Sequence, residues 1–114
     1  MAVTVFAAPI LPGKTEDWKA AVAEMKGPRA AEHAESRAMH GVTREVACLQ
    51  QTPMGDFVCV FLEADDPDTV LKRQMESDHP FDQWFCEAVL AGCHGMTSDG
   101  DTPPPNVLYV DWSA

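Results

Sequence analysis

The middle of the chain carries two long β-forming runs, residues 42–52 and 57–63, separated only by a short turn. The linking residues 52–56 read TPMGD, in which proline presets a turn and glycine can adopt a left-handed conformation. These runs are therefore predicted to form a β-hairpin. Further β-type runs at residues 3–10 and 107–112 lie on either side of it, and each is separated from the hairpin by a helical pattern.

The helical patterns cover residues 15–39 and 67–90, with expected breaks at Gly27-Pro28 and at His79-Pro80. The order β, α, β, β, α, β is typical of the split βαβ arrangement of ferredoxin-like folds. We therefore expect an α+β domain with a four-stranded antiparallel sheet and helices on one face. The proline-rich residues 97–105 are expected to link the body to the last strand.

The chain is short and strongly acidic. Its 114 residues allow one domain, residues 1–114, and eight Lys plus Arg against eighteen Asp plus Glu give a formal charge of −10. Such a surface repels phosphate backbones and anionic lipid, so we expect no nucleic-acid partner and no membrane association. A basic signal-peptide start and a long apolar stretch are both missing, and we expect a cytoplasmic protein.

The run 57–63 is apolar on both sides. Alternation places three aliphatic residues on one side and two phenylalanines on the other: Val58, Val60 and Leu62 against Phe57, Cys59, Phe61 and Glu63. Helices cover only one face of such a sheet, so we expect a homodimer in which two sheets pack together. The aliphatic side should meet the helices, and the phenylalanine side should enclose a small hydrophobic or aromatic ligand.

The element order, the hairpin LQQTPMGDFVCVFLEADDPD and the helix break SDHPFDQWF are similar to those of the dimeric α/β-barrel superfamily over residues 3–112. This superfamily includes antibiotic-biosynthesis monooxygenase-like, EthD-like and stress-responsive barrel proteins, and the chain resembles an uncharacterised bacterial family within it. The resemblance implies paired sheets and a small aromatic or polyketide-like molecule held between sheet and helices. Other members bind haem. Because one fold serves many activities, the resemblance does not decide the function.

A polar stripe continues the apolar face of the first helical region. At helical spacing, Trp18, Val22 and Met25 are followed by Arg29, His33, Ser36 and His40. If the Gly27-Pro28 break keeps the register, His33 is a candidate catalytic base and His40 a candidate ligand contact. If the break rotates the face, alanines pack inward instead and the histidines are solvated.

Arg44 and Glu45 begin the second strand, so only one of them can face the interior. We expect Arg44 there, where its guanidinium would anchor an oxyanion, and an ordinary salt bridge is the alternative. Phe57 and Phe61 are the expected aromatic ligand contacts. By resemblance alone, His79 is a second candidate catalytic residue and Trp84 a further ligand contact. The simpler interpretation is an exposed His79 before a proline and a core Trp84.

The chain carries no nucleotide-binding or hydrolase motif and no CxxC pair, and its four cysteines are expected to be buried free thiols. We expect no metal site and no cofactor, with haem as the alternative. Two functions remain. One is a non-catalytic, stress-associated protein that binds a small molecule. The other is a cofactor-independent monooxygenase, isomerase or cyclase, in which His33 or His79 abstracts a proton and Arg44 stabilises the oxyanion.

Overall fold

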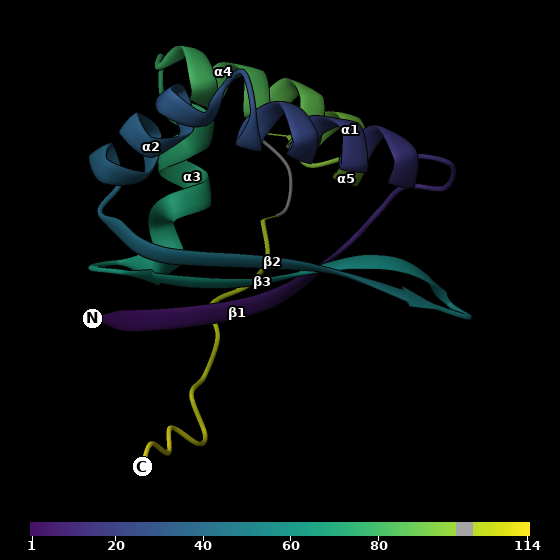
Figure 1. The fold of residues 1–114 in the computed structure, drawn as a ribbon. Helices are drawn as coiled ribbons and strands as arrows, with labels where there is room; N and C mark the ends of the chain where they lie inside the picture. Colours follow the sequence, from purple (N-terminus) through teal and green to yellow (C-terminus); the bar gives the residue numbers. More distant parts are fainter. Residues whose placement is uncertain (98–101) are drawn as a thin grey trace.

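One antiparallel sheet and one layer of helices make up the fold (Figure 1). The computed structural model describes residues 1–97 and 102–114. Strands β1 (Ala2–Pro9), β2 (Val42–Thr52) and β3 (Gly55–Ala64) form a sheet of order β1-β3-β2. The helices all lie on one side of the sheet, and the C-terminal tail leaves on the other side.

The helical layer contains the two predicted breaks. The first region forms α1 (Thr15–Lys26) and α2 (Ala30–Met39). The second region contains the 3-10 turn η1 (Pro67–Thr69) and three short α-helices, α3 (Val70–Glu76), α4 (Pro80–Phe85) and α5 (Gly92–His94), with the π-helical turn η2 (Cys86–Ala91) between α4 and α5. It ends at Gly95, whose φ of 70° is the left-handed conformation of a helix C-terminus. No helix in the described ranges is both long enough and apolar enough to cross a membrane.

The predicted four-stranded sheet is wrong, and with it the ferredoxin-like βαββαβ fold and the barrel built from it. The fold is α+β with three antiparallel strands. Asn106 reaches β1, where its side-chain oxygen accepts a hydrogen bond from the Val5 backbone N–H, but residues 107–112 then run clear of the sheet. Residue types that favour strands do not make a strand unless the segment also pairs with an edge. Residues 98–101 of the predicted linker lie outside the described residues.

The face of the sheet that meets the helices carries the aliphatic side of β3, as the alternation predicted. Val58 and Leu62 are 3% and 2% exposed. Val58 packs with Trp18 of α1 and Val89 of η2, while Leu62 packs with Val70 of α3. The core therefore fills the space between the helices and this inner face.

The opposite face, called here the outer face, carries the other side of each strand. From the strand register it consists of Val3, Val5, Ala7 and Pro9 on β1, Arg44, Val46, Cys48 and Gln50 on β2, and Phe57, Cys59, Phe61 and Glu63 on β3. In Figure 1 this face has no helix against it.

A β-bulge at the start of β2 decides which charged side chain faces the helices. Val42 pairs with Ala64, but Arg44 pairs with Glu63, so β2 has one extra residue at this point. Without the shift, Arg44 would lie opposite Leu62 and face the core. With it, Arg44 lies on the outer face and Glu45 lies opposite Leu62 on the inner face.

Candidate functional site

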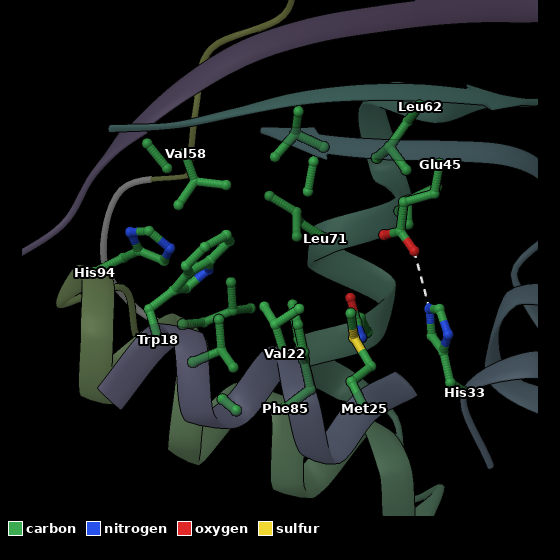
Figure 2. Close-up of a pocket in the computed structure, with 18 of the residues that line it drawn as sticks. Trp18, Val22, Met25, His33, Glu45, Val58, Leu62, Leu71, Phe85 and His94 are labelled. Atoms are coloured by element: carbon green, nitrogen blue, oxygen red, sulfur yellow. Dashed lines mark hydrogen bonds and ion pairs between the residues drawn. The ribbon is translucent and has the colours of Figure 1, made fainter. Parts of the chain in front are cut away.

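A pocket of about 330 Å³ lies between the inner face of the sheet and the helical layer (Figure 2). Its walls are mostly apolar and come from all three strands and from the helices; they include Trp18, Val22, Met25, Val58, Val60, Leu62, Leu71, Phe85 and Val89. The volume is at the lower end of the range for small-molecule sites. In Figure 2, His94 lies at one end of the pocket, and Glu45 with His33 lies at the other.

The charged end of the pocket joins the sheet to α2. Glu45 Oε1 lies 2.9 Å from Nε2 of His33, and Glu45 Oε2 lies 3.2 Å from Nη1 of Arg37. His33 and Arg37 are one helical turn apart on α2, so both reach the same carboxylate. The ring of Phe81 lies against His33 at a centroid distance of 5.1 Å and holds it in place from the side of α4.

The Glu45 carboxylate is held in its charged form. Burial raises its pKa, but the hydrogen bond from His33 and the charges of Arg37 and His33 outweigh burial, so the pKa lies below its usual value. The charged Glu45 is an acceptor for the Nε2–H of His33, and when the imidazole is neutral this tautomer leaves Nδ1 as the acceptor nitrogen. This end of the pocket therefore contains a compensated ion pair and an oriented imidazole.

Gln74 of α3 also lines the pocket, and its side-chain amide is unsatisfied. The residue is 1% exposed, and both Nε2 and Oε1 lack a hydrogen-bond partner among residues 1–97 and 102–114. The same holds for Nε of Arg37. A buried donor or acceptor without a partner costs about 1–3 kcal/mol, so such groups are uncommon and point to a missing partner. Two donors and one acceptor are thus available to a bound molecule.

His94 of α5 lies at the other end of the pocket, near Trp18 and Val58 (Figure 2). Its Nδ1 donates to the carbonyl oxygen of Pro9 at 2.8 Å. Burial lowers its pKa, and the Pro9 hydrogen bond only partly opposes this, so the ring is neutral at pH 7. A neutral ring that donates from Nδ1 has Nε2 as a hydrogen-bond acceptor.

The polar stripe of α2 faces inward, and the alternative of an inward alanine face is wrong. His33 is half-buried in the pocket, whereas Ala30, Ala31, Ala34 and Ala38 are exposed. His40, predicted as a ligand contact, lies outside the pocket. It is 5% exposed, and its Nε2 lies 2.8 Å from Asp82 Oδ2.

Asp82 is the centre of a buried network between α2 and α4. It is fully buried, and its other oxygen accepts a hydrogen bond from Ser36 Oγ at 2.5 Å. Burial raises the pKa of Asp82, but the hydrogen bonds from Ser36, Ser77 and His40 outweigh burial, so the pKa lies below its usual value and the carboxylate stays charged. Since these groups are shielded from solvent, they fasten one helix to the other.

The remaining predicted site residues do not line the pocket. Arg44 lies on the outer face with its guanidinium 5.7 Å from the Phe61 ring centroid, and Phe57 is on the same face. His79 is the N-cap of α4, where its Nδ1 accepts from the Phe81 N–H. Trp84 packs under the guanidinium of Arg29 at 4.5 Å. Of the predicted residues, the structure brings only His33 into the pocket.

Four pocket residues were missed by the sequence analysis as site residues: Arg37, Glu45, Gln74 and His94. Arg37 was detectable, because it lies one helical turn after His33. Glu45 was weighed against Arg44, and the bulge decides in its favour. Nothing in the sequence distinguishes the Gln74 amide from that of a surface glutamine.

Metal ligands do not gather in the part of the chain that the structure describes: no three His, Cys, Asp or Glu side chains lie together there in a suitable group. Comparisons with protein-family models, with curated proteins and with solved structures found no match to this chain. Membership of the superfamily named above therefore stays a prediction, and the function has to be argued from the pocket.

Proposed function

We propose that the chain binds a small, elongated, mainly apolar molecule in the pocket, with an uncharged hydrogen-bonding group of that molecule against Gln74. The observation that carries the proposal is the buried Gln74 amide, which has neither a donor nor an acceptor among the described residues. A primary or secondary amide, or a hydroxy-carbonyl group, would satisfy both of its atoms at once. The proposal needs no cofactor.

The charges around the pocket favour an uncharged ligand. Glu45 is already charged and is balanced by Arg37 at 3.2 Å. A ligand carboxylate would lie beside the Glu45 carboxylate, and a ligand ammonium would lie beside Arg37; both arrangements carry like-charge repulsion in a poorly solvated space. The apolar walls exclude water and suit the apolar part of the ligand, so only the ligand's polar head group needs hydrogen bonds.

A second candidate function, proton transfer on the bound molecule, is favoured by the hydrogen bond between His33 and Glu45. A carboxylate that holds Nε2–H leaves Nδ1 as a base, which is how an oriented histidine works in general base catalysis. With a ketone in the pocket, His33 would remove a proton from the carbon next to the carbonyl. The electron pair would move onto the carbonyl oxygen, where the Arg37 Nε–H and the Gln74 amide N–H would stabilise it.

The binding proposal is tested with octanamide, octan-1-ol and octanoate, which share a chain and differ in the head group. Isothermal titration calorimetry should show tightest binding for octanamide and weakest for octanoate. Gln74→Met keeps the side chain's size and removes both polar atoms, so it should weaken octanamide binding at least tenfold, about 1.4 kcal/mol. The matched control is Gln83→Met, because Gln83 is exposed on α4.

Gln74→Met also distinguishes a ligand-binding role of the Gln74 amide from an unfavourable buried amide without a function. In the empty protein it removes two buried atoms that have no partner in the described part of the chain, so it should raise the free energy of unfolding by about 1–3 kcal/mol while binding is lost. Equal octanamide affinity in the wild-type and Gln74→Met proteins would show that the amide does not recognise the ligand. Equal or tighter binding of octanoate would refute an uncharged ligand.

A further inference from the structure

The C-terminal tail is the most apolar exposed segment of the described chain. Five of its large side chains are 63–90% exposed: Val107, Leu108, Tyr109, Val110 and Trp112. Scattered apolar residues on a surface are ordinary, but a continuous exposed run of this kind marks an interaction site. In a single copy of the chain these side chains are exposed to water, so the tail needs a covering surface from elsewhere.

Both sides of the tail are apolar when it is extended. Side chains alternate along an extended segment, so Val107 and Tyr109 point to one side, and Leu108 and Val110 point to the other. Folding the tail back onto its own sheet would bury one of these sides and leave the other in water. This pattern is typical of a strand that is buried on both faces between two apolar layers.

The outer face of the sheet is the matching uncovered surface. Val5 is 55% exposed on it, and no helix covers it in Figure 1. The tail reaches this side of the molecule, because Asn106 accepts the Val5 N–H and the chain then continues away from the helices. Two uncovered apolar surfaces thus lie next to each other in the same molecule.

Charge makes a second copy of this chain the best partner for the outer face. The chain carries a formal charge of −10, so two copies repel each other over most of their surface. Among the strand residues that form the outer face, only Arg44 and Glu63 are charged; they lie opposite each other in neighbouring strands, and their formal charges cancel. Two outer faces can therefore approach at little electrostatic cost.

We propose that two copies of the chain associate through their outer faces and that the tail of each copy, residues 107–112, lies between its own sheet and that of the partner. A two-fold axis gives both copies the same contacts and covers both sides of each tail. This arrangement covers the exposed apolar run and the outer face together. It also enlarges the small core of a 114-residue chain.

Sedimentation equilibrium of the full chain tests the association. The wild type should be a dimer at micromolar concentration. Leu108→Asp with Val110→Asp on the tail, and separately Val5→Asp on the outer face, should each raise the dimer dissociation constant at least tenfold. These sites are exposed, so the variants should fold. Met54→Asp at the hairpin tip, 91% exposed, is the control that should leave the constant unchanged.

Isotope-filtered NMR on a mixture of carbon-13-labelled and unlabelled chains tests the position of the tail. Contacts from Tyr109 or Trp112 of one copy to Phe61 of the other are expected. Alkylation of the exposed Cys48 thiol on the outer face should slow at least tenfold as the protein concentration rises through the dissociation constant. A monomer at 100 micromolar, or a dimer whose tail contacts lie within one chain only, would overturn the proposal.

Discussion

The carboxylate of Glu45 on β2 lies 2.9 Å from Nε2 of His33 on α2, and this hydrogen bond closes the charged end of the pocket. It joins residues from the sheet and from the helical layer, so the pocket depends on how the two layers are docked. Both partners are about three-quarters shielded, with side chains 26% and 24% exposed for His33 and Glu45. The bond therefore contributes more than a surface ion pair of the same length would.

His33→Gln should abolish proton transfer on a bound ketone and leave the fold intact. The probe is 2-tetralone in heavy water, whose protons next to the carbonyl exchange for deuterium when a base removes them. Proton NMR should show wild-type exchange faster than buffer, and His33→Gln should slow the protein-dependent part by about 10²–10⁴, the range for loss of a general base. His79→Gln is the control, because His79 lies outside the pocket.

An exchange rate that is the same with and without the wild-type protein would reject the proton-transfer function. It would leave the binding proposal standing, because binding requires only the walls of the pocket and the Gln74 amide. Equal exchange in the wild-type and His33→Gln proteins would assign any catalysis to another group.

Asp82→Ala should be strongly destabilising. The substitution removes the shared acceptor of Ser36 and His40 and leaves both without that partner in a buried place. A buried polar group that loses its hydrogen-bond partner costs about 1–3 kcal/mol, and here two groups lose theirs. Urea unfolding followed by circular dichroism measures the loss, with Asp78→Ala as the exposed control. A loss below about 1 kcal/mol would contradict the role given to this network.

The free energy of unfolding should fall steeply in acid because of the carboxylates of Asp82 and Glu45. Both have folded-state pKa values below those of the unfolded chain, so the unfolded chain binds more protons as the pH falls. Their contribution is fully present above about pH 5, and it decreases as the pH falls through about 4 toward the folded pKa values. Asp82→Asn should flatten this part of the curve of unfolding free energy against pH, and an unchanged slope would show that Asp82 does not titrate this way.

The thiols of Cys86 and Cys93 should resist alkylation. Burial, together with the nearby Asp82 charge, raises the pKa of Cys86 to about 11, and burial also raises that of Cys93, which is 1% exposed. Since the thiolate is the reactive form, iodoacetamide at pH 8 should modify both far more slowly than the exposed Cys48 in dilute protein. Peptide mass spectrometry measures the alkylation rate of each cysteine, and unfolding in guanidinium should make these rates equal. Equal rates in the folded protein would contradict this burial.

Much of the fold could be predicted from local patterns. Residues 42–52 were assigned as a strand, and β2 has those bounds; the break at Gly27-Pro28 was also correct, and the inward polar stripe of α2 was one of two alternatives that the sequence left open. Each rests on periodicity or on proline and glycine geometry, which act within a few residues. The last strand was wrong because residues 107–112 have strand-forming side chains but pair with neither edge strand of the sheet, β1 or β2.

The candidate site was less predictable, because it depends on register and docking. One extra residue in β2 exchanges Arg44 for Glu45 at the inner face, and such a bulge has no clear signal in the residue types around Thr43. Gln74 becomes a site residue only because α3 packs with that side toward the pocket and leaves its amide without a partner among residues 1–97 and 102–114. His94 lies far from Glu45 in the sequence, and its hydrogen bond to the Pro9 carbonyl oxygen holds it at the pocket.

The most direct test of the ligand site is the nitrogen-15 NMR signal of the Gln74 side-chain amide during titration with octanamide. Gln74→Met identifies the signal by its disappearance. If the pocket binds the ligand as proposed, the Gln74 amide signals shift in a saturable way and their hydrogen exchange slows, while those of the exposed Gln83 do not change. Unchanged Gln74 signals at saturating octanamide, or shifts confined to the outer face, would contradict the account.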